Sequence, residues 1–346
     1  MRALAIVLLP LGLVLASGFS GRGGLEAIAV SSDGKQLAVG GQNRVVYLVD
    51  ADKLTVQSRL WLGVRIQALA FSKDGSHLAV SDETNRIQTL SLATGKAVAS
   101  RKQAGGFQVY PPGDLIAVRD LMDNLRHNLV ILELPTFKEV QRIDVPERPI
   151  AWAFDADGKN LLILGASKLG EEKAISADEV PRDLRGLARW TFRQKNDGLE
   201  STLYTAEVAT GKLGPSINTW YTSDSDSTQL LRAGSTIYVF NRFNQCARIG
   251  SKGETVMFET AQGTNHALGF SPDAKLLLTG GMDGGSVSML EGDRRQLFRL
   301  DEQPGQAEYV NRFALRQEGP IWAVTSGFRL VRISRGARVE QVVPVY

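Results

Sequence analysis

The chain has 346 residues, of which 43% are hydrophobic and 22% are charged, a composition that excludes disordered and fibrous proteins. Its 40 lysine and arginine residues nearly balance 37 aspartate and glutamate residues, so the net charge is only +3. We therefore expect no overall positive field for binding nucleic acid. The single cysteine, Cys246, excludes an internal disulfide framework and zinc sites that need two or more cysteines.

Residues 1–20 have the pattern of a secretory signal peptide. A positive residue near the start precedes an apolar run over residues 3–15, and small residues follow it. The run is shorter than the roughly 20 apolar residues that a membrane-spanning helix needs, and Pro10 interrupts it. We expect cleavage between Ser17 and Gly24, which would leave a periplasmic or secreted mature chain without a transmembrane span. An uncleaved membrane anchor is the alternative.

One sequence unit recurs along the rest of the chain. Each copy has an apolar or alternating strand, a turn of the type Ser/Asp-x-Asp-Gly, and a second apolar strand that ends in small residues, which is the pattern of a β-hairpin. The four clearest copies occupy residues 26–41, 66–82, 150–165 and 266–281. Three weaker copies occupy residues 107–118, 228–240 and 311–324. The sequence thus predicts seven hairpins.

The spacing of the hairpins indicates the architecture. The turn residues of the seven copies are Gly34, Gly75, Gly113, Gly158, Gly234, Ala274 and Gly319. Their separations are 41, 38, 45, 76, 40 and 45 residues, and a third and a short fourth strand follow each hairpin. About 40 residues for four antiparallel strands is the period of a propeller blade. The expected fold of residues 21–346 is an all-β, seven-bladed β-propeller with four antiparallel strands per blade.

The units that contain Phe71, Phe154 and Phe270 resemble those of WD-repeat and related bacterial propellers. The resemblance implies the propeller fold but no particular function. The Trp-Asp and Gly-His signatures of true WD repeats are missing from this sequence, so we expect apolar packing, not a buried polar network, to hold the blades together. The first blade is complete over residues 25–62 and the last over residues 311–345. We therefore expect the ring to close by packing of these two blades, without exchange of a strand.

The gap of 76 residues contains an insertion of about 35 residues in blade four, at about 168–200, after the second strand. Its first half is acidic, and its second half carries a basic aromatic patch of a kind common in protein interfaces. The patch, which we predict to bind a partner, consists of Arg182, Arg185, Arg189, Trp190, Phe192 and Arg193. Two structures remain open. A helix would place the arginines on one face, whereas the alternation over residues 187–193 also fits an extended hairpin.

The insertion is also similar to a long hairpin in the propellers of prolyl-oligopeptidase-type enzymes. Their hydrolase signature Gly-x-Ser-x-Gly does not occur in this sequence.

The sequence predicts no catalytic, cofactor-binding or metal-binding residues. The histidines His77, His127 and His266 are too few and too scattered for a metal site of known spacing. The segment 155–158 resembles part of a calcium loop but lacks the further oxygen ligands. Cys246 has no histidine near it in sequence, and we expect a buried, unreactive thiol.

Two hypotheses about function follow. The first is a non-catalytic, exported scaffold that binds a protein partner, an acidic one if the insertion forms the interface. The second is an enzyme or a binder of a small ligand at the central channel, similar to a lactone hydrolase; whether the chain is an enzyme stays open, and the scaffold is favoured. The candidates at the channel mouth are Arg44, Arg65, Arg86, Arg126, Arg148, Tyr221, Asn265, Asp283 and Tyr309.

Overall fold

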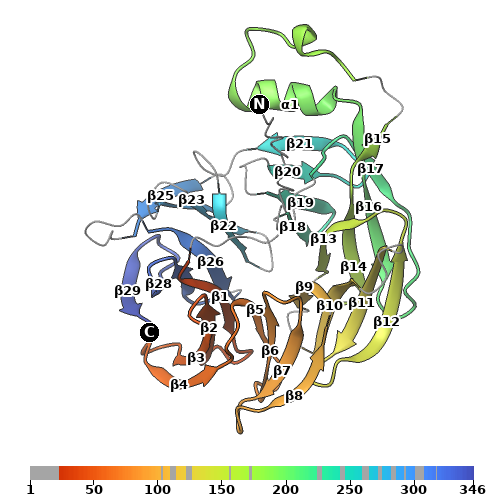
Figure 1. Cartoon of the computed structure of the whole chain (residues 1–346). Coiled ribbons are helices and arrows are strands. Elements are labelled where there is room, and N and C mark those ends of the chain that lie inside the picture. The colour runs from red at the N-terminus through yellow and green to blue at the C-terminus, as the bar shows by residue number, and fades with distance from the viewer. Residues whose placement is uncertain are drawn as a thin grey trace, which may run out of the picture.

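Seven antiparallel blades of four strands are arranged in a ring, with the first strand of each blade at the centre and the last at the rim (Figure 1), and blade four carries one additional short strand, β15. This confirms the predicted seven-bladed propeller. The computed structural model describes residues 23–346 except 103, 110–113, 122–126, 156, 171–173, 224–227, 242–245, 259–264, 272–274, 282–285, 292–293, 301–307 and 317. The predicted signal peptide lies outside the described residues.

The blades follow one another in chain order. Blades one to three contain β1 Leu25–Val30, β2 Gln36–Gly41, β3 Val45–Asp50, β4 Val56–Trp61, β5 Ile66–Phe71, β6 His77–Asp82, β7 Ile87–Ser91, β8 Ala97–Arg101, β9 Ala104–Val109, β10 Leu115–Asp120, β11 His127–Glu133 and β12 Lys138–Val145. Blade four contains β13 Pro149–Phe154, β14 Asn160–Gly165, β15 Lys168–Leu169, β16 Leu199–Glu207 and β17 Ile217–Thr219. Blades five to seven contain β18 Gln229–Ala233, β19 Thr236–Phe240, β20 Cys246–Ile249, β21 Thr255–Phe258, β22 Asn265–Phe270, β23 Leu276–Gly281, β24 Ser286–Glu291, β25 Arg294–Arg299, β26 Val310–Leu315, β27 Ile321–Thr325, β28 Arg329–Ile333 and β29 Val339–Pro344.

The recurring turn has the same hydrogen bonds in different blades. In blade two, Ser72 Oγ donates to Asp74 Oδ1 at 2.6 Å and accepts the backbone N–H of His77 at 3.0 Å. Blade one repeats both bonds with its own serine and aspartate. Gly75 completes the turn at a φ of 69°, a conformation that costs a residue with a side chain free energy. The motif is therefore explained by turn chemistry. Two of the seven predicted turn residues, Gly113 and Ala274, lie outside the described residues.

We expect Asp74 to titrate with a pKa of about 2, because hydrogen bonds from the hydroxyls of Ser72 and Ser76 stabilise its carboxylate. A pKa below that of the unfolded chain means that the turn stabilises the fold above about pH 4 and loses this contribution as the pH falls toward 2. NMR titration of the Asp74 carboxyl in wild type and Ser72→Ala will measure the pKa. It should rise in the variant, and an unchanged value would contradict the assigned cause.

Apolar clusters join neighbouring blades, as expected from the missing WD signatures. Each pair of adjacent blades shares a cluster of buried side chains, so that a continuous apolar core runs around the ring. Between blades five and six, Phe240 and Cys246 pack against Leu277, and Cys246 is fully buried. A buried thiol among apolar groups is a packing element. This placement agrees with the expected structural role of the cysteine.

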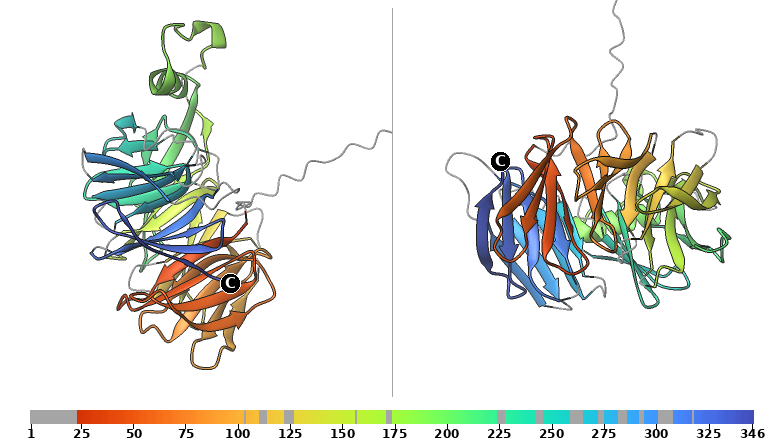
Figure 2. Two further views of the ribbon diagram at one scale, coloured as in Figure 1. Left: turned by 90° about the vertical axis from the view of Figure 1, so that its left-hand side faces the viewer. Right: turned by 90° about the horizontal axis from the view of Figure 1, so that it is seen from below.

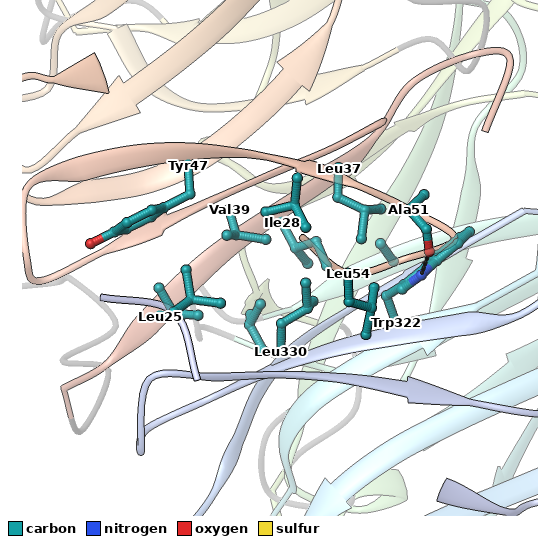
Figure 3. Close-up of a cluster of buried hydrophobic side chains, with 13 residues drawn as sticks. Leu25, Ile28, Leu37, Val39, Tyr47, Ala51, Leu54, Trp322 and Leu330 are labelled. Atoms are coloured by element: carbon teal, nitrogen blue, oxygen red, sulfur yellow. Dashed lines mark hydrogen bonds between the residues drawn. The ribbon is translucent and has the colours of Figure 1, made fainter. Parts of the chain in front are cut away.

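Blades one and seven close the ring, and each keeps its own four strands. Figure 3 shows their shared core, in which Leu25 and Leu37 of blade one face Leu330 and Trp322 of blade seven. Trp322 is only 2% exposed, and its indole N–H donates to the backbone oxygen of Ala51 at 3.4 Å. Side-chain hydrogen bonds to backbone oxygens of blade one flank this core. Packing without strand exchange is thus confirmed.

The described residues contain one α-helix, α1 Gly186–Lys195, and one short 3-10 helix, η1 Ala177–Glu179, both in the blade-four insertion. Neither is long and apolar enough to cross a membrane.

Candidate functional site: the blade-four insertion

The insertion leaves blade four between β14 and β16 and projects outward from the rim of the ring (Figure 2). At its base, β15 pairs with the start of β16, so that Lys168 lies opposite Glu200 and Leu169 opposite Leu199. The N–H of Gly170 donates to the oxygen of Gly198 at 2.8 Å and extends this short ladder by one bond. The second and third strands of the blade are therefore lengthened, but only by a few residues.

The segment of the basic aromatic patch is helical from Gly186 to Lys195, so the extended hairpin over residues 187–193 is wrong. Apolar side chains at Leu187 and Trp190, with Gln194 one turn further, are spaced three and four residues apart and form one helical face. The helix ends at Lys195 and is capped by Asn196, whose side-chain amide donates to the oxygen of Phe192 at 2.7 Å and thereby satisfies a carbonyl of the last turn.

One face of α1 is docked on blade five. Leu187 and Trp190 pack against the cluster that contains Tyr221, which is fully buried. The amide of Gln194 forms a two-way contact with Thr222: its oxygen accepts the backbone N–H at 3.1 Å, and its nitrogen donates to the side-chain hydroxyl at 3.1 Å. Apolar burial combined with a paired amide fixes the orientation of the helix on the ring.

The opposite face of α1 carries the arginines. At 100° per residue, Arg189 and Phe192 lie on the side away from blade five and Arg193 lies at the edge of that side, while Arg185 is the residue that precedes the helix. Arg182, in the turn before the helix, is exposed, as are Arg185 and Arg193, whereas Arg189, Trp190 and Phe192 are half-buried. The structure thus divides the predicted patch: Trp190 contacts the ring, and the other members surround the outer face.

Part of this basic group also stabilises its own segment. The guanidinium of Arg185 donates to the backbone oxygens of Arg182 and Leu184, and that of Arg189 donates to the oxygen of Pro181 at 3.5 Å. Both arginines are held near the start of the helix by these bonds. A guanidinium has five N–H donors, so each retains donors for another group.

The base of the insertion is tied to the loop that precedes β13. Glu147 in that loop accepts a hydrogen bond from the hydroxyl of Tyr204 on β16 and forms an ion pair with Lys168 at 3.1 Å. Burial and the neighbouring carboxylate raise the pKa of Tyr204 to about 12, so its hydroxyl stays protonated at neutral pH and remains the donor. The insertion is therefore braced at its base and along α1.

Two of the residues predicted at the channel mouth form ion pairs with neighbouring carboxylates. Arg65 pairs with Glu26, and Arg86 pairs with Asp82. Tyr221 was expected at the surface because of its loop position. It is instead fully buried in the cluster against which α1 packs. Arg126 and Asp283 lie outside the described residues. The remaining candidates, Arg44, Arg148, Asn265 and Tyr309, are spread over blades one, four, six and seven.

Within the described ranges, no group of three or more His, Cys, Asp or Glu side chains is arranged to hold a metal ion. The ring nitrogen Nδ1 of His77 lies 2.7 Å from the hydroxyl of Ser76, in the turn of blade two. Gln194, an anchor of α1, was not predicted from the sequence. Its spacing from Leu187 and Trp190 was the signal that could have identified it.

Comparisons with known proteins support the fold alone. No protein-family model matches the chain, and no curated protein matches it. Among solved structures, a chain of the hydrazine synthase of Kuenenia stuttgartiensis is similar, with a TM-score of 0.59 and 14% sequence identity. The similarity covers 93% of this chain and 96% of that one. At such low identity, the resemblance concerns the propeller architecture and not the activity.

Proposed function

We propose that this protein is an exported, non-catalytic scaffold and that the outer face of α1 binds an acidic segment of a protein partner. The observation that carries the proposal is the orientation of the helix: its apolar face is docked on blade five, and its arginines face outward. Export rests on the pattern of the first 20 residues.

The helix dipole favours only two of the positive charges of α1, Arg193 and Lys195 in its last turn. Between residues 185 and 195 there are four basic residues and no acidic one, and the first turn has no acidic residue. Positive charge near a helix N-terminus is unfavourable because it opposes the helix dipole. Arg185 and Arg189 occupy that end. An acidic partner would compensate a charge arrangement that costs the isolated helix stability.

The geometry suits recognition of carboxylates. Arg189 and Arg193 are one turn apart on the same face, and a guanidinium can bind a carboxylate through two parallel hydrogen bonds. Phe192 lies between them in the sequence and is half-buried, so it offers apolar area beside the charges. Arginine and aromatic side chains dominate the binding energy of many interfaces. Because α1 is anchored, little of that energy is lost in ordering the helix.

The test begins with a photo-crosslinking aromatic amino acid in place of Phe192, and, as a position control, in place of Val98 on the rim of blade two. Products specific to position 192 identify the partner. The affinity of that partner is then measured for Arg189→Glu/Arg193→Glu. We expect a loss of roughly 30-fold or more, since truncation of one interface anchor typically costs about 2 kcal/mol, and weaker binding at higher salt.

The matched control is Lys102→Glu/Lys138→Glu. Both lysines are exposed, lie on blades two and three, and give the same change in net charge. This variant should bind the partner as the wild type does. Equal losses in both double variants, or binding that α1 variants do not affect, would show that the partner contacts another part of the ring.

A further inference from the structure

Three charged side chains lie together at the inner edge of blades seven, one and two. Glu26 on β1 receives two hydrogen bonds from the guanidinium of Arg65, at 2.7 and 2.9 Å. Arg65 immediately precedes β5, and Arg312 lies on β26. These strands are the innermost ones of their blades (Figure 1). The group, which we name the inner charge cluster, is far in sequence from α1 and is independent of the proposed partner interface.

Arg312 departs from the pattern of the repeat. In six blades the innermost strand has a register shift near its start, and the residue that resumes the pairing is structurally equivalent from blade to blade. The equivalents of Arg312 are Phe107 in blade three and an alanine in four other blades, Ala27, Ala68, Ala151 and Ala267. A methyl group suffices to pack this position in four blades. The guanidinium in blade seven is therefore not required by the fold.

The charge of Arg312 is incompletely compensated. Its Nε is buried and has no hydrogen-bond partner, and with the described residues the guanidinium forms neither a hydrogen bond nor an ion pair. Glu26 acts on Arg312 electrostatically, but both of its oxygens are engaged by Arg65. Arg312 is half-buried, and partial desolvation of the guanidinium lowers its pKa. Such a group favours an anion in contact with it.

We infer that the inner charge cluster binds a small ligand through a carboxylate or another oxyanion, with Arg312 as the contacting residue. A guanidinium presents paired N–H donors that match the two oxygens of such a group. The two hydrogen bonds from Arg65 hold the carboxylate of Glu26 in place. Glu26 in turn interacts electrostatically with the guanidinium of Arg312. The centre of the ring would thereby recognise a small molecule, whereas α1 recognises a protein.

The carboxylate of Glu26 makes this site sensitive to pH. Burial raises the pKa of Glu26, Arg65 and Arg312 oppose that rise, and Glu83 adds to it. When the pH falls and Glu26 takes up a proton, a negative charge beside the anion disappears. Anion binding should therefore strengthen as the pH decreases. Sulfate is the suitable probe for this dependence, because its charge does not change over the same range.

The experiment is calorimetric titration of the full chain with sodium sulfate and, separately, sodium succinate, at an ionic strength fixed with chloride. The two probes distinguish an inorganic oxyanion from an organic carboxylate. We expect saturable one-to-one binding of at least one of them at about 1 mM or tighter. Arg312→Met should weaken it at least tenfold, and Glu26→Gln should strengthen it several-fold and remove the pH dependence. Arg338→Met, at an exposed arginine between β28 and β29 of blade seven, is the control and should bind as the wild type does.

The melting temperature provides a second measurement if a variant binds too weakly for calorimetry. In chloride alone, Arg312→Met should melt at or above the wild-type temperature, because a partly desolvated charge whose Nε lacks a hydrogen-bond partner has been removed. Added sulfate or succinate should stabilise the wild type and leave Arg312→Met unchanged. The inference is overturned if neither anion binds or stabilises the wild type, or if Arg312→Met responds to them as the wild type does.

Discussion

Replacing Trp322 by alanine will lower the free energy of unfolding by about 3–5 kcal/mol, as truncation of a large buried aromatic side chain typically does. Trp322 is 2% exposed and lies in the core that blades one and seven share. Its loss also leaves the carbonyl oxygen of Ala51 without the indole donor. The cavity would form at the seam where the ring closes. Chemical denaturation followed by tryptophan fluorescence and circular dichroism will measure the change.

Trp61→Ala is the matched control, because Trp61 belongs to blade one but is 70% exposed. Its truncation should change the free energy of unfolding by less than about 0.5 kcal/mol. If Trp322→Ala were as mild as Trp61→Ala, the packing of blades one and seven would not be what holds the ring closed. We expect Trp322→Ala to lower the free energy of unfolding more than Trp61→Ala does.

The repeat was predictable because each hairpin carries its own local signals. In blade two, the serine and aspartate of the turn bond to one another and Gly75 takes a positive φ, so short-range chemistry determines the turn. Alternation of apolar side chains then determines which strand faces pass into the clusters between blades. Blade number followed from counting these turns, and closure without strand exchange followed from the completeness of the first and last blades.

The sequence did not decide between a helix and an extended hairpin in the insertion. Residues 187–193 alternate as a strand does, and the same residues place Leu187 and Trp190 on one helical face. What decides between the two is the surface of blade five, where Thr222 receives Gln194 and a cluster around Tyr221 receives the apolar side chains. That surface is formed by residues distant in sequence, so the choice depends on tertiary contacts.

The inner charge cluster could not be predicted from the sequence either, because it too depends on tertiary contacts. Glu26, Arg65 and Arg312 come from blades one, two and seven, and only closure of the ring brings them together. In the sequence, Arg312 stands at a position that four other repeats fill with alanine, but a departure in a degenerate repeat is a weak signal. The structure shows that Nε of Arg312 is buried and lacks a hydrogen-bond partner, and this distinguishes Arg312 from an ordinary substitution in a repeat.

Replacing the insertion by a short Gly-Ser turn will leave the ring folded and abolish capture of the partner. The replaced segment is best taken as residues 170–198, because β15 and the start of β16 then keep their pairing and Lys168 keeps its ion pair with Glu147. Blade four retains its strands, and the loss of Leu187 and Trp190 uncovers only the side of the blade-five cluster that α1 covers. We expect a modest fall in the melting temperature and an unchanged β-sheet circular dichroism spectrum.

Capture of the partner is then compared between the deletion and Arg189→Glu/Arg193→Glu. Both should lose it, since they share the loss of the outer basic face. A deletion variant that unfolds would show that α1 is a structural cover for blade five, and the charge-reversed protein, which keeps the docked helix, would still report on the interface. A deletion variant that folds and binds every partner with wild-type affinity would place the interface elsewhere on the ring. Because α1 is held by one face and charged on the other, these two variants separate its contribution to stability from its contribution to binding.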